Sequence, residues 1–163
     1  MKTILAASLV LAVSTPVLAQ DYAEEIMQAD RDFSAYAKDH TIAEAFALYM
    51  DSVDGRLLRG PGEPITGEAA IYENFVNYSD TLILHWEPSE AFASEAGDFG
   101  MSWGWYYVYR EGDMSVPADD RGKYVTVWRR NAEGEWRGLL DMGTRDGSYQ
   151  RPDSSAESPP DNE

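Results

Sequence analysis

The sequence predicts an α+β domain in which three helices come first and pack on one face of an antiparallel sheet. Apolar residues recur at helical spacing in residues 22–39, 41–50 and 68–77. Strand-like runs follow at residues 82–93, 99–110, 122–130 and 135–142, and the breaks between them contain Gly, Asn and acidic residues. Such breaks suit hairpin connections between neighbouring strands. Helices that precede a meander of this kind are typical of the α+β class.

The helices are predicted from their apolar stripes and from one capping motif. In residues 22–39 the apolar stripe includes Phe33, and the acidic residues, Asp30 among them, are expected on the opposite side. Thr41-x-x-Glu44 has the form of a capping box, in which each residue satisfies a backbone donor of the other. This motif predicts that the second helix begins directly after Thr41.

The run at residues 99–110 is expected to have one bulky and one slim face, because side chains alternate between the two faces of a strand. The bulky face consists of Phe99, Met101, Trp103, Trp105, Tyr107 and Tyr109. The slim face begins with Gly100, Ser102 and Gly104. We expect the bulky face either to pack against another part of the domain or to bind a ligand.

Both ends of the chain are predicted to lie outside the single domain, which spans residues 20–147. Residues 1–19 have a basic start and a small-residue site at Ala19, which predicts a secretory signal peptide cut after Ala19. A retained membrane anchor is the alternative, although the apolar run is shorter than the roughly twenty residues that span a bilayer. Residues 148–163 are rich in Pro, Ser and acid, which predicts disorder. The protein is therefore expected in the periplasm or outside the cell.

The composition argues against several classes of partner and chemistry. The formal net charge is −16, so nucleic acid and anionic membrane surfaces would be repelled. The sequence has no phosphate-binding Gly-rich loop, no G-x-S-x-G motif and no cysteine. With only two histidines, a zinc or copper site is not expected. We expect no nucleic acid, membrane, cofactor or metal among the partners.

Several short motifs resemble one known superfamily in their order and spacing. They include Gly67-Glu68-Ala69-Ala70-Ile71, Leu84-His85-Trp86-Glu87-Pro88, Gly97-Asp98-Phe99-Gly100 and Gly122-Lys123-Tyr124-Val125-Thr126-Val127-Trp128. Together they resemble the nuclear transport factor 2-like superfamily, which has a cystatin-like fold, and within it the SnoaL-like branch of small secreted bacterial proteins of unknown function. The resemblance implies that a strongly curved sheet wraps its concave face around the helices. The result would be a cone with an open pocket.

The same resemblance implies which residues line that pocket. They lie on four successive strands and are Trp86, Met101, Trp103, Trp105, Tyr107, Tyr124, Thr126, Trp128, Arg137, Leu139 and Asp141. Their rings could stack on a flat or apolar ligand, or they could simply fill the core of the cone. Ketosteroid isomerase belongs to the same superfamily, and the positions of its catalytic groups correspond here to Phe33, Leu57 and Thr126. Enolisation needs a base and oxyanion donors, so that mechanism lacks its parts in this chain.

Asp141 is the one carboxylate among these predicted pocket residues. A carboxyl group buried among aromatic rings would have a raised pKa, and Asp141 could act as a general acid or base with Tyr124 as a donor. Alternatively, Asp141 could pair with Arg137 or accept hydrogen bonds from Tyr124 and Thr126, and so only hold the sheet together.

Three functions are consistent with the sequence. The first, which we favour, is a secreted domain that binds a small apolar or aromatic molecule without transforming it. The second is a small cofactor-independent isomerase, dehydratase or cyclase that uses the carboxylate described above. The third is a scaffold that forms a homodimer through the outer sheet face, with Val108, Val125 and Val127. Arg56 and Arg59, near the expected pocket lip, could hold an anionic ligand or be ordinary surface charges.

Overall fold

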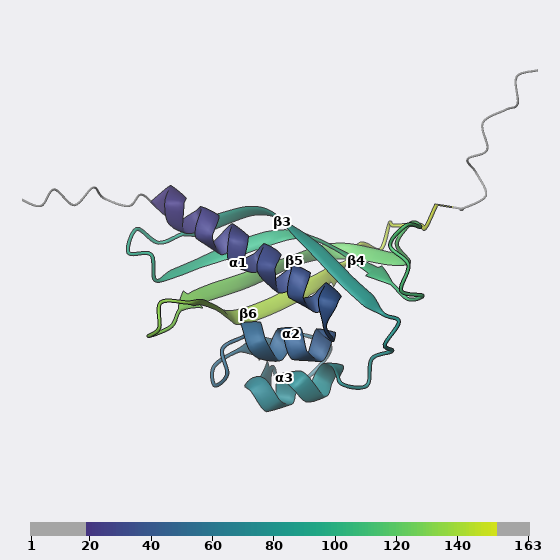
Figure 1. Cartoon of the computed structure of the whole chain (residues 1–163), viewed down its shortest axis with the longest axis horizontal. Helices are drawn as coiled ribbons and strands as arrows, with labels where there is room; N and C mark the ends of the chain where they lie inside the picture. The colour runs from purple at the N-terminus through teal and green to yellow at the C-terminus, as the bar shows by residue number, and fades with distance from the viewer. Residues whose placement is uncertain (1–18, 153–163) are drawn as a thin grey trace, which may run out of the picture.

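The computed structural model describes residues 19–152, which form three helices and six strands (Figure 1). The helices are α1 (Ala19–Asp39), α2 (Ile42–Tyr49) and α3 (Glu68–Phe75). The strands are β1 (Arg56–Leu57), β2 (Ile65–Thr66), β3 (Ile83–Ala93), β4 (Phe99–Tyr109), β5 (Asp120–Arg130) and β6 (Trp136–Arg145). The predicted α+β class is confirmed.

The strands form one open sheet in the order β2-β1-β6-β5-β4-β3. The four long strands pair antiparallel through successive hairpins, as the sequence predicted. The two-residue strand β1 adds to β6 in the parallel direction, with Arg56 opposite Leu140 and Leu57 opposite Asp141. The sheet is therefore mixed rather than purely antiparallel, and this parallel pairing joins segments that are far apart in the chain.

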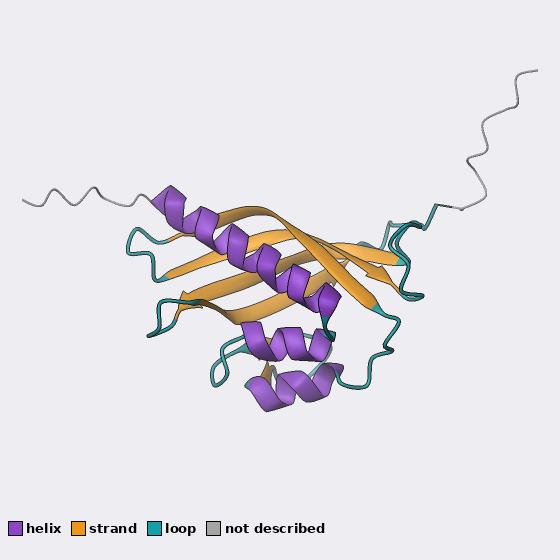
Figure 2. Ribbon diagram, viewed as in Figure 1, coloured by secondary structure: helices purple, strands orange, loops and turns teal. Residues whose placement is uncertain are grey.

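The helices lie on one face of the sheet (Figure 2). Helix α1 runs diagonally across the long strands and contacts mainly β3, whereas α2 and α3 pack against each other near β6. The predicted capping box is present at α2: the Glu44 N–H donates to Thr41 Oγ1 (3.1 Å), and the Thr41 N–H donates to Glu44 Oε2 (3.0 Å). This cap fixes the turn between α1 and α2.

Helix α1 also covers the free edge of β3, the last strand of the sheet. The Ser34 hydroxyl donates to the Trp86 carbonyl (2.7 Å) and accepts a hydrogen bond from the Trp86 N–H (3.1 Å). Edge strands otherwise leave such backbone groups without a partner. His85 is half-buried beside the same hydroxyl, at 3.4 Å from Nδ1, and burial lowers the pKa of its imidazole.

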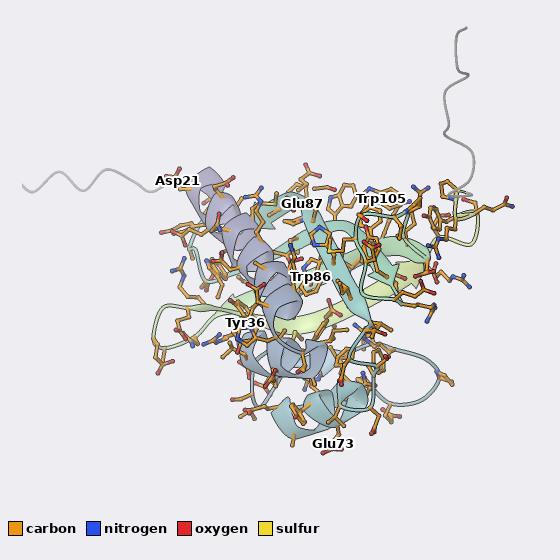
Figure 3. The ribbon with its side chains drawn as sticks, turned by 45° about the vertical axis from the view of Figure 1, so that its right-hand side comes forward. Asp21, Tyr36, Glu73, Trp86, Glu87 and Trp105 are labelled. Atoms are coloured by element: carbon orange, nitrogen blue, oxygen red, sulfur yellow. The ribbon has the colours of Figure 1, made fainter. Side chains whose placement is uncertain are left out.

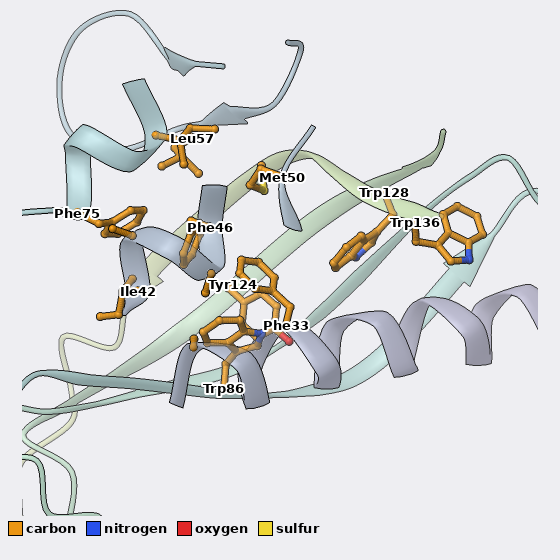
Figure 4. Close-up of a cluster of buried hydrophobic side chains, with 14 of the residues drawn as sticks. Phe33, Ile42, Phe46, Met50, Leu57, Phe75, Trp86, Tyr124, Trp128 and Trp136 are labelled. Carbon is orange, nitrogen blue, oxygen red and sulfur yellow. The ribbon is translucent and has the colours of Figure 1, made fainter. Parts of the chain in front are cut away.

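The aromatic core lies between the helices and the inner face of the sheet (Figure 4). Phe33 is at its centre and meets Phe46 and Trp86 edge-on, with ring centroids 4.8 Å apart in both pairs. Trp128 is fully buried, with its ring perpendicular to that of Phe33. Because α1, α2, β3 and β5 each contribute a ring, this cluster joins the helices to the sheet.

Strand β4 faces opposite to the prediction. Its small residues are buried toward the helices, namely Gly100, Ser102 and Gly104. Its large residues are only partly buried and lie on the outer face, namely Met101, Trp103, Trp105 and Tyr107. Figure 3 shows Trp86 beside α1 and Trp105 away from the three helices. The prediction that the bulky face lines the interior was therefore wrong.

The close approach of α1 explains this orientation. A Cβ atom added to Gly100 would lie only 2.4 Å from Ile26 Cδ1, so large side chains do not fit between α1 and β4. The strand register agrees, because Ser102 lies opposite Thr126 and directly paired residues share a face. The bulky stripe is on the outer face because the inner face has no room for it.

The ends of the described chain bear on two further predictions. Except for Ala19, the predicted signal peptide lies outside the described residues, as does most of the predicted tail. Two residues from the start of that tail contact the domain: the Tyr149 hydroxyl donates to the Ala118 carbonyl (2.8 Å), and Arg151 pairs with Asp119. Within residues 19–152, no helix has both the length and the apolar character needed to cross a membrane.

Candidate functional site

A cavity of about 510 Å³ lies between the inner face of the sheet and the helices. Helices α1 and α2, the four long strands and the connecting loops contribute to its wall, which consists of Phe33, Phe46, Arg59, Tyr78, Leu82, Leu84, Trp86, Tyr106, Val108, Arg110, Tyr124, Thr126, Asp141 and Gly143. Small-molecule pockets in proteins commonly span roughly 300–1,000 Å³ and are lined mainly by apolar and aromatic groups with a few polar ones. The cavity fits that description.

The cavity has a buried apolar end and an exposed mouth. Phe33, Phe46 and Trp86 are almost completely buried and form the deep end. Tyr78 and Arg110 are exposed and mark the mouth. A bound molecule would therefore place its apolar part inside and leave a polar part near solvent.

Asp141 lies in the cavity wall with both carboxylate oxygens engaged. Arg59 Nη2 lies 3.2 Å from Oδ1, and the Thr126 hydroxyl donates to Oδ2 at 3.0 Å. Burial raises the pKa of the Asp141 carboxyl, and the Arg59 charge and the Thr126 hydrogen bond act in the opposite direction. Of the partners considered from the sequence, Thr126 contacts Asp141, but Arg137 donates instead to the Leu48 carbonyl and to Glu135.

A second buried carboxylate, Asp30, lies behind the cavity wall. It is fully buried and accepts hydrogen bonds from Trp86 Nε1 (2.8 Å), Ser102 Oγ (2.6 Å) and the Tyr124 hydroxyl (2.8 Å). Burial raises the pKa of Asp30 to about 6, against the lowering effect of these three hydrogen bonds. Asp30 thus fixes residues of β3, β4 and β5 to α1, and two of its three donors, Trp86 and Tyr124, also line the cavity.

Tyr124 connects Asp30 to the cavity wall. Its ring lines the cavity, and its hydroxyl donates to Asp30. Burial, followed by the charge of Asp30, raises the pKa of the Tyr124 phenol far above its ordinary value, so this hydroxyl keeps its proton. Its one proton is donated to Asp30, and the hydroxyl is not available as a base.

The structure brings four of the predicted pocket residues together in the cavity wall: Trp86, Tyr124, Thr126 and Asp141. Trp128 points to the same side but belongs to the packed core, where its Nε1 donates to Ser102 Oγ (2.9 Å). The predicted inward faces of β3 and β5 were therefore correct.

The remaining predicted pocket residues lie elsewhere. Met101, Trp103, Trp105 and Tyr107 are on the outer face of β4, as described above. Arg137 and Leu139 do not line the cavity, because an irregularity in the β5–β6 register shifts the alternation: Trp128 lies opposite Gly138, but Val127 lies opposite Leu140. Leu139 is the extra residue of that bulge. The alternation of β6 side chains between the two faces of the sheet therefore shifts by one residue at Leu139.

The sequence prediction also missed several site residues. Asp30 was assigned to the polar side of α1, yet it follows Ile26 by four residues and precedes Phe33 by three, so helical spacing places it within the buried stripe. Tyr106 lines the cavity through the face of β4 that was taken as external. No local signal identifies Arg110, which lies at the mouth because β4 ends there.

Within residues 19–152, no three His, Asp or Glu side chains gather closely enough to hold a metal ion.

Comparison with known proteins identifies the fold. No protein-family model matches the sequence, and no curated protein matches it either. An NTF2-like protein with a cystatin-like fold from Novosphingobium aromaticivorans superposes with a TM-score of 0.61 and is 21% identical, over 77% of this chain and 82% of that one. The chain has the NTF2-like, cystatin-like fold. The superfamily resemblance seen in the sequence is thereby confirmed at the level of the fold.

Other NTF2-like structures show how varied proteins with this fold are. A ketosteroid isomerase-like protein from Erwinia carotovora atroseptica has a TM-score of 0.58 and 14% identity, over 74% of this chain and 94% of that one. A protein from Catenulispora acidiphila in complex with S-DNPA has a TM-score of 0.57 and 16% identity, over 76% of this chain and 92% of that one. One fold hosts many functions, so the NTF2-like architecture does not by itself assign an activity.

Proposed function

We propose that this NTF2-like chain binds a small molecule with an apolar or aromatic body in its cavity and does not transform it. The observation that carries the proposal is the engagement of Asp141, whose two oxygens are held by Arg59 and Thr126. Both contacts stabilise the charged form of the carboxylate and so make it a weaker base. Most of the other lining groups are aromatic or aliphatic, which suits an apolar ligand. The Catenulispora acidiphila protein, crystallised in complex with S-DNPA, supports small-molecule binding in this fold.

The test uses N-phenylnaphthylamine, a neutral aromatic dye whose fluorescence increases when it leaves water. Val108→Trp places a large ring on the cavity wall, and Val125→Trp makes the same change on the outer face of β5. We expect saturable binding to the wild-type protein and to Val125→Trp, and at least tenfold weaker binding to Val108→Trp. Leu84→Trp, on β3, also fills the cavity and replaces Val108→Trp in this test if Val108→Trp does not fold.

Two results would overturn the proposal. One is the absence of saturable binding to the wild-type protein. The other is equal binding by the cavity-filling and outer-face variants, which would place the dye on the outer aromatic stripe of β4 instead.

A second candidate is a cofactor-independent isomerase, dehydratase or cyclase with Asp141 as general acid or base. The observation in its favour is that burial raises the pKa of Asp141, which lines the cavity. Titration of the Asp141 carboxyl carbon by NMR tests it. A pKa at or below the ordinary value of about 4 would remove the general-base role.

We also propose that the chain is exported to the periplasm or secreted, as residues 1–19 predict. Sequencing the N-terminus of the protein purified from its own cells tests this proposal. A mature chain that begins at Gln20 supports export, and a chain that retains Met1 contradicts it.

We further propose a homodimer through the outer sheet face. Val125 and Val127 are on that face, where Trp103 and Trp105 accompany them, whereas Val108 lines the cavity and drops out of the predicted interface. Light scattering coupled to size-exclusion chromatography would show a dimer that Val127→Asp converts to a monomer. A wild-type monomer at micromolar concentration would contradict the proposal.

A further inference from the structure

The cavity is locally positive in a strongly acidic chain. Its lining residues include two guanidinium groups, Arg59 and Arg110, and one carboxylate, Asp141. The formal charge of the lining is therefore +1, and protonation of Asp141 would only make it more positive. The whole chain has a net charge of −16, so a positive cavity is contrary to its general composition.

Arg59 has hydrogen-bond donors to spare. A guanidinium group offers five N–H donors, and the hydrogen bond that Arg59 makes is from Nη2 to Asp141. Its Nε is buried and has no hydrogen-bond partner among the described residues. The group lies over the rings of Phe46 and Phe75, at 5.3 and 4.8 Å from their centroids, which holds it in the wall. The side chain is still about one-third exposed, so Arg59 is fixed in place and its remaining Nη N–H groups, rather than the buried Nε, are the donors open to a ligand.

Arg110 is the second cation, and it lies at the exposed mouth. Within residues 19–152 its guanidinium forms no ion pair. Asp119 accepts a hydrogen bond from the Arg110 backbone N–H (2.7 Å) and pairs with the guanidinium of Arg151, and Asp120 pairs with Arg145. Unlike most arginines among the described residues, Arg110 therefore has a guanidinium that forms no ion pair.

These charges and the apolar interior are arranged in order of depth. The rings of Phe33 and Trp86 form the buried end, Arg59 is about one-third exposed, and Arg110 is at the mouth. We propose that the cavity selects an amphipathic organic anion, with its apolar or aromatic body between these rings and its carboxylate or sulfonate held by Arg59 and Arg110. This inference rests on the proposed binding function and specifies the class of ligand.

The test compares two dyes with the same ring system. Anilinonaphthalene sulfonate is N-phenylnaphthylamine with an added sulfonate, so the difference in their affinities reports on the anion alone. We expect the sulfonate to bind more tightly to the wild-type protein in spite of the net negative charge. Arg110→Gln should weaken sulfonate binding about fivefold, which corresponds to about 1 kcal/mol, and leave the neutral dye unaffected.

The matched control is Lys123→Gln. Lys123 is an exposed cation beside Tyr124 in the chain, but it lies on the outer face of β5, so the variant removes the same charge without touching the cavity. Arg59→Gln should weaken sulfonate binding further; because it leaves Asp141 unpaired, it is used only if its thermal unfolding shows a folded protein. The comparison of Arg110→Gln with Lys123→Gln tests the proposal whether or not Arg59→Gln folds.

The outcomes separate this inference from the function on which it rests. If neither dye binds in the cavity, the proposed function itself fails, and the ligand class fails with it. If both dyes bind and Val108→Trp removes both, but the sulfonate binds no better and Arg110→Gln changes nothing, the binding function stands and the anion preference is wrong. If Arg110→Gln and Lys123→Gln weaken binding of the sulfonate dye equally, the effect is one of general charge, and the proposed preference of the cavity for an anion is also overturned.

Discussion

Asp30 should make the domain less stable as the pH rises, and the substitution Asp30→Asn should remove this effect. Burial raises the pKa of Asp30 in the folded state to about 6, compared with an ordinary value of 3.8. Between these two values the folded state binds more protons than the unfolded state. The free energy of unfolding therefore decreases with rising pH. The contribution of this group is fully present below the unfolded pKa and is lost as the pH rises through about 6.

The size of the effect follows from the same two values. A pKa that rises from 3.8 to about 6 corresponds to a loss of about 3 kcal/mol in the free energy of unfolding. About 1.3 kcal/mol of this loss falls between pH 5 and pH 7, from the proton-binding curves of the two states. This interval lies above the isoelectric point of the chain, about 4.3, where its solubility is lowest.

Urea unfolding followed by tryptophan fluorescence at pH 5, 6 and 7 measures this difference. The free energy of unfolding of Asp30→Asn, minus that of the wild type, should increase by about 1.3 kcal/mol from pH 5 to pH 7, whatever the absolute stability of the variant. Asp32→Asn is the matched control, because Asp32 lies on the same helix but is exposed. If the difference in unfolding free energy between Asp30→Asn and the wild type stays constant with pH, the raised pKa of Asp30 is refuted. A difference of opposite sign would show that the three hydrogen bonds outweigh burial.

Substitutions at three further sites, Ser102, Thr41 and Arg59, test side-chain interactions that stabilise the domain. Ser102→Ala should destabilise the domain by about 1–3 kcal/mol in urea unfolding, because it removes a buried donor to Asp30, and Ser102→Thr should cost less if the hydroxyl is what matters. Thr41→Ala should cost about 1 kcal/mol by the loss of the α2 cap, measured as a lower Tm, and Thr41→Ser should restore most of it. Arg59→Met should cost about 3 kcal/mol because it leaves Asp141 buried and unpaired, and Arg59→Met with Asp141→Leu should be more stable than Arg59→Met alone. An additive double variant would show that the pair is not coupled.

The elements of the fold could be predicted because their signals are local. Helical spacing identified α1, the Thr41 and Glu44 motif identified the start of α2, and alternation identified the long strands. Alternation also placed Trp86 and Tyr124 on the inner face correctly. These patterns extend over a few residues, so the sequence contains them in full.

The face of β4 could not be decided by the size of its side chains. Its aromatic stripe suggested a core or a pocket wall, but which face of a strand is buried depends on what packs against it. Here α1 approaches closely enough that Gly100 and Ser102 fit and tryptophan does not. The pairing of β4 with β5 indicates the buried face of β4 better than side-chain size does. Tyr124 and Thr126 were expected on the inner face, and the β4 residues paired with them lie on the same face. Small residues on one face of a strand therefore indicate where a helix packs.

The pairing of Asp141 shows why the charged part of the site was not visible in the sequence. Arg59 and Asp141 are 82 residues apart, and no local pattern links them. They meet because the two-residue strand β1 pairs in parallel with β6 and places Leu57 opposite Asp141, so that Arg59, two residues later, lies at the cavity wall. The Leu58 N–H donates to the Asp141 carbonyl (2.9 Å), which extends this pairing to the residue before Arg59. The pairing of the two-residue strand β1 thus gives the buried carboxylate a cationic partner. Without Arg59, Asp141 would be an unpaired carboxylate in the cavity wall, and the cavity would lack one of the two cations proposed to hold an anion.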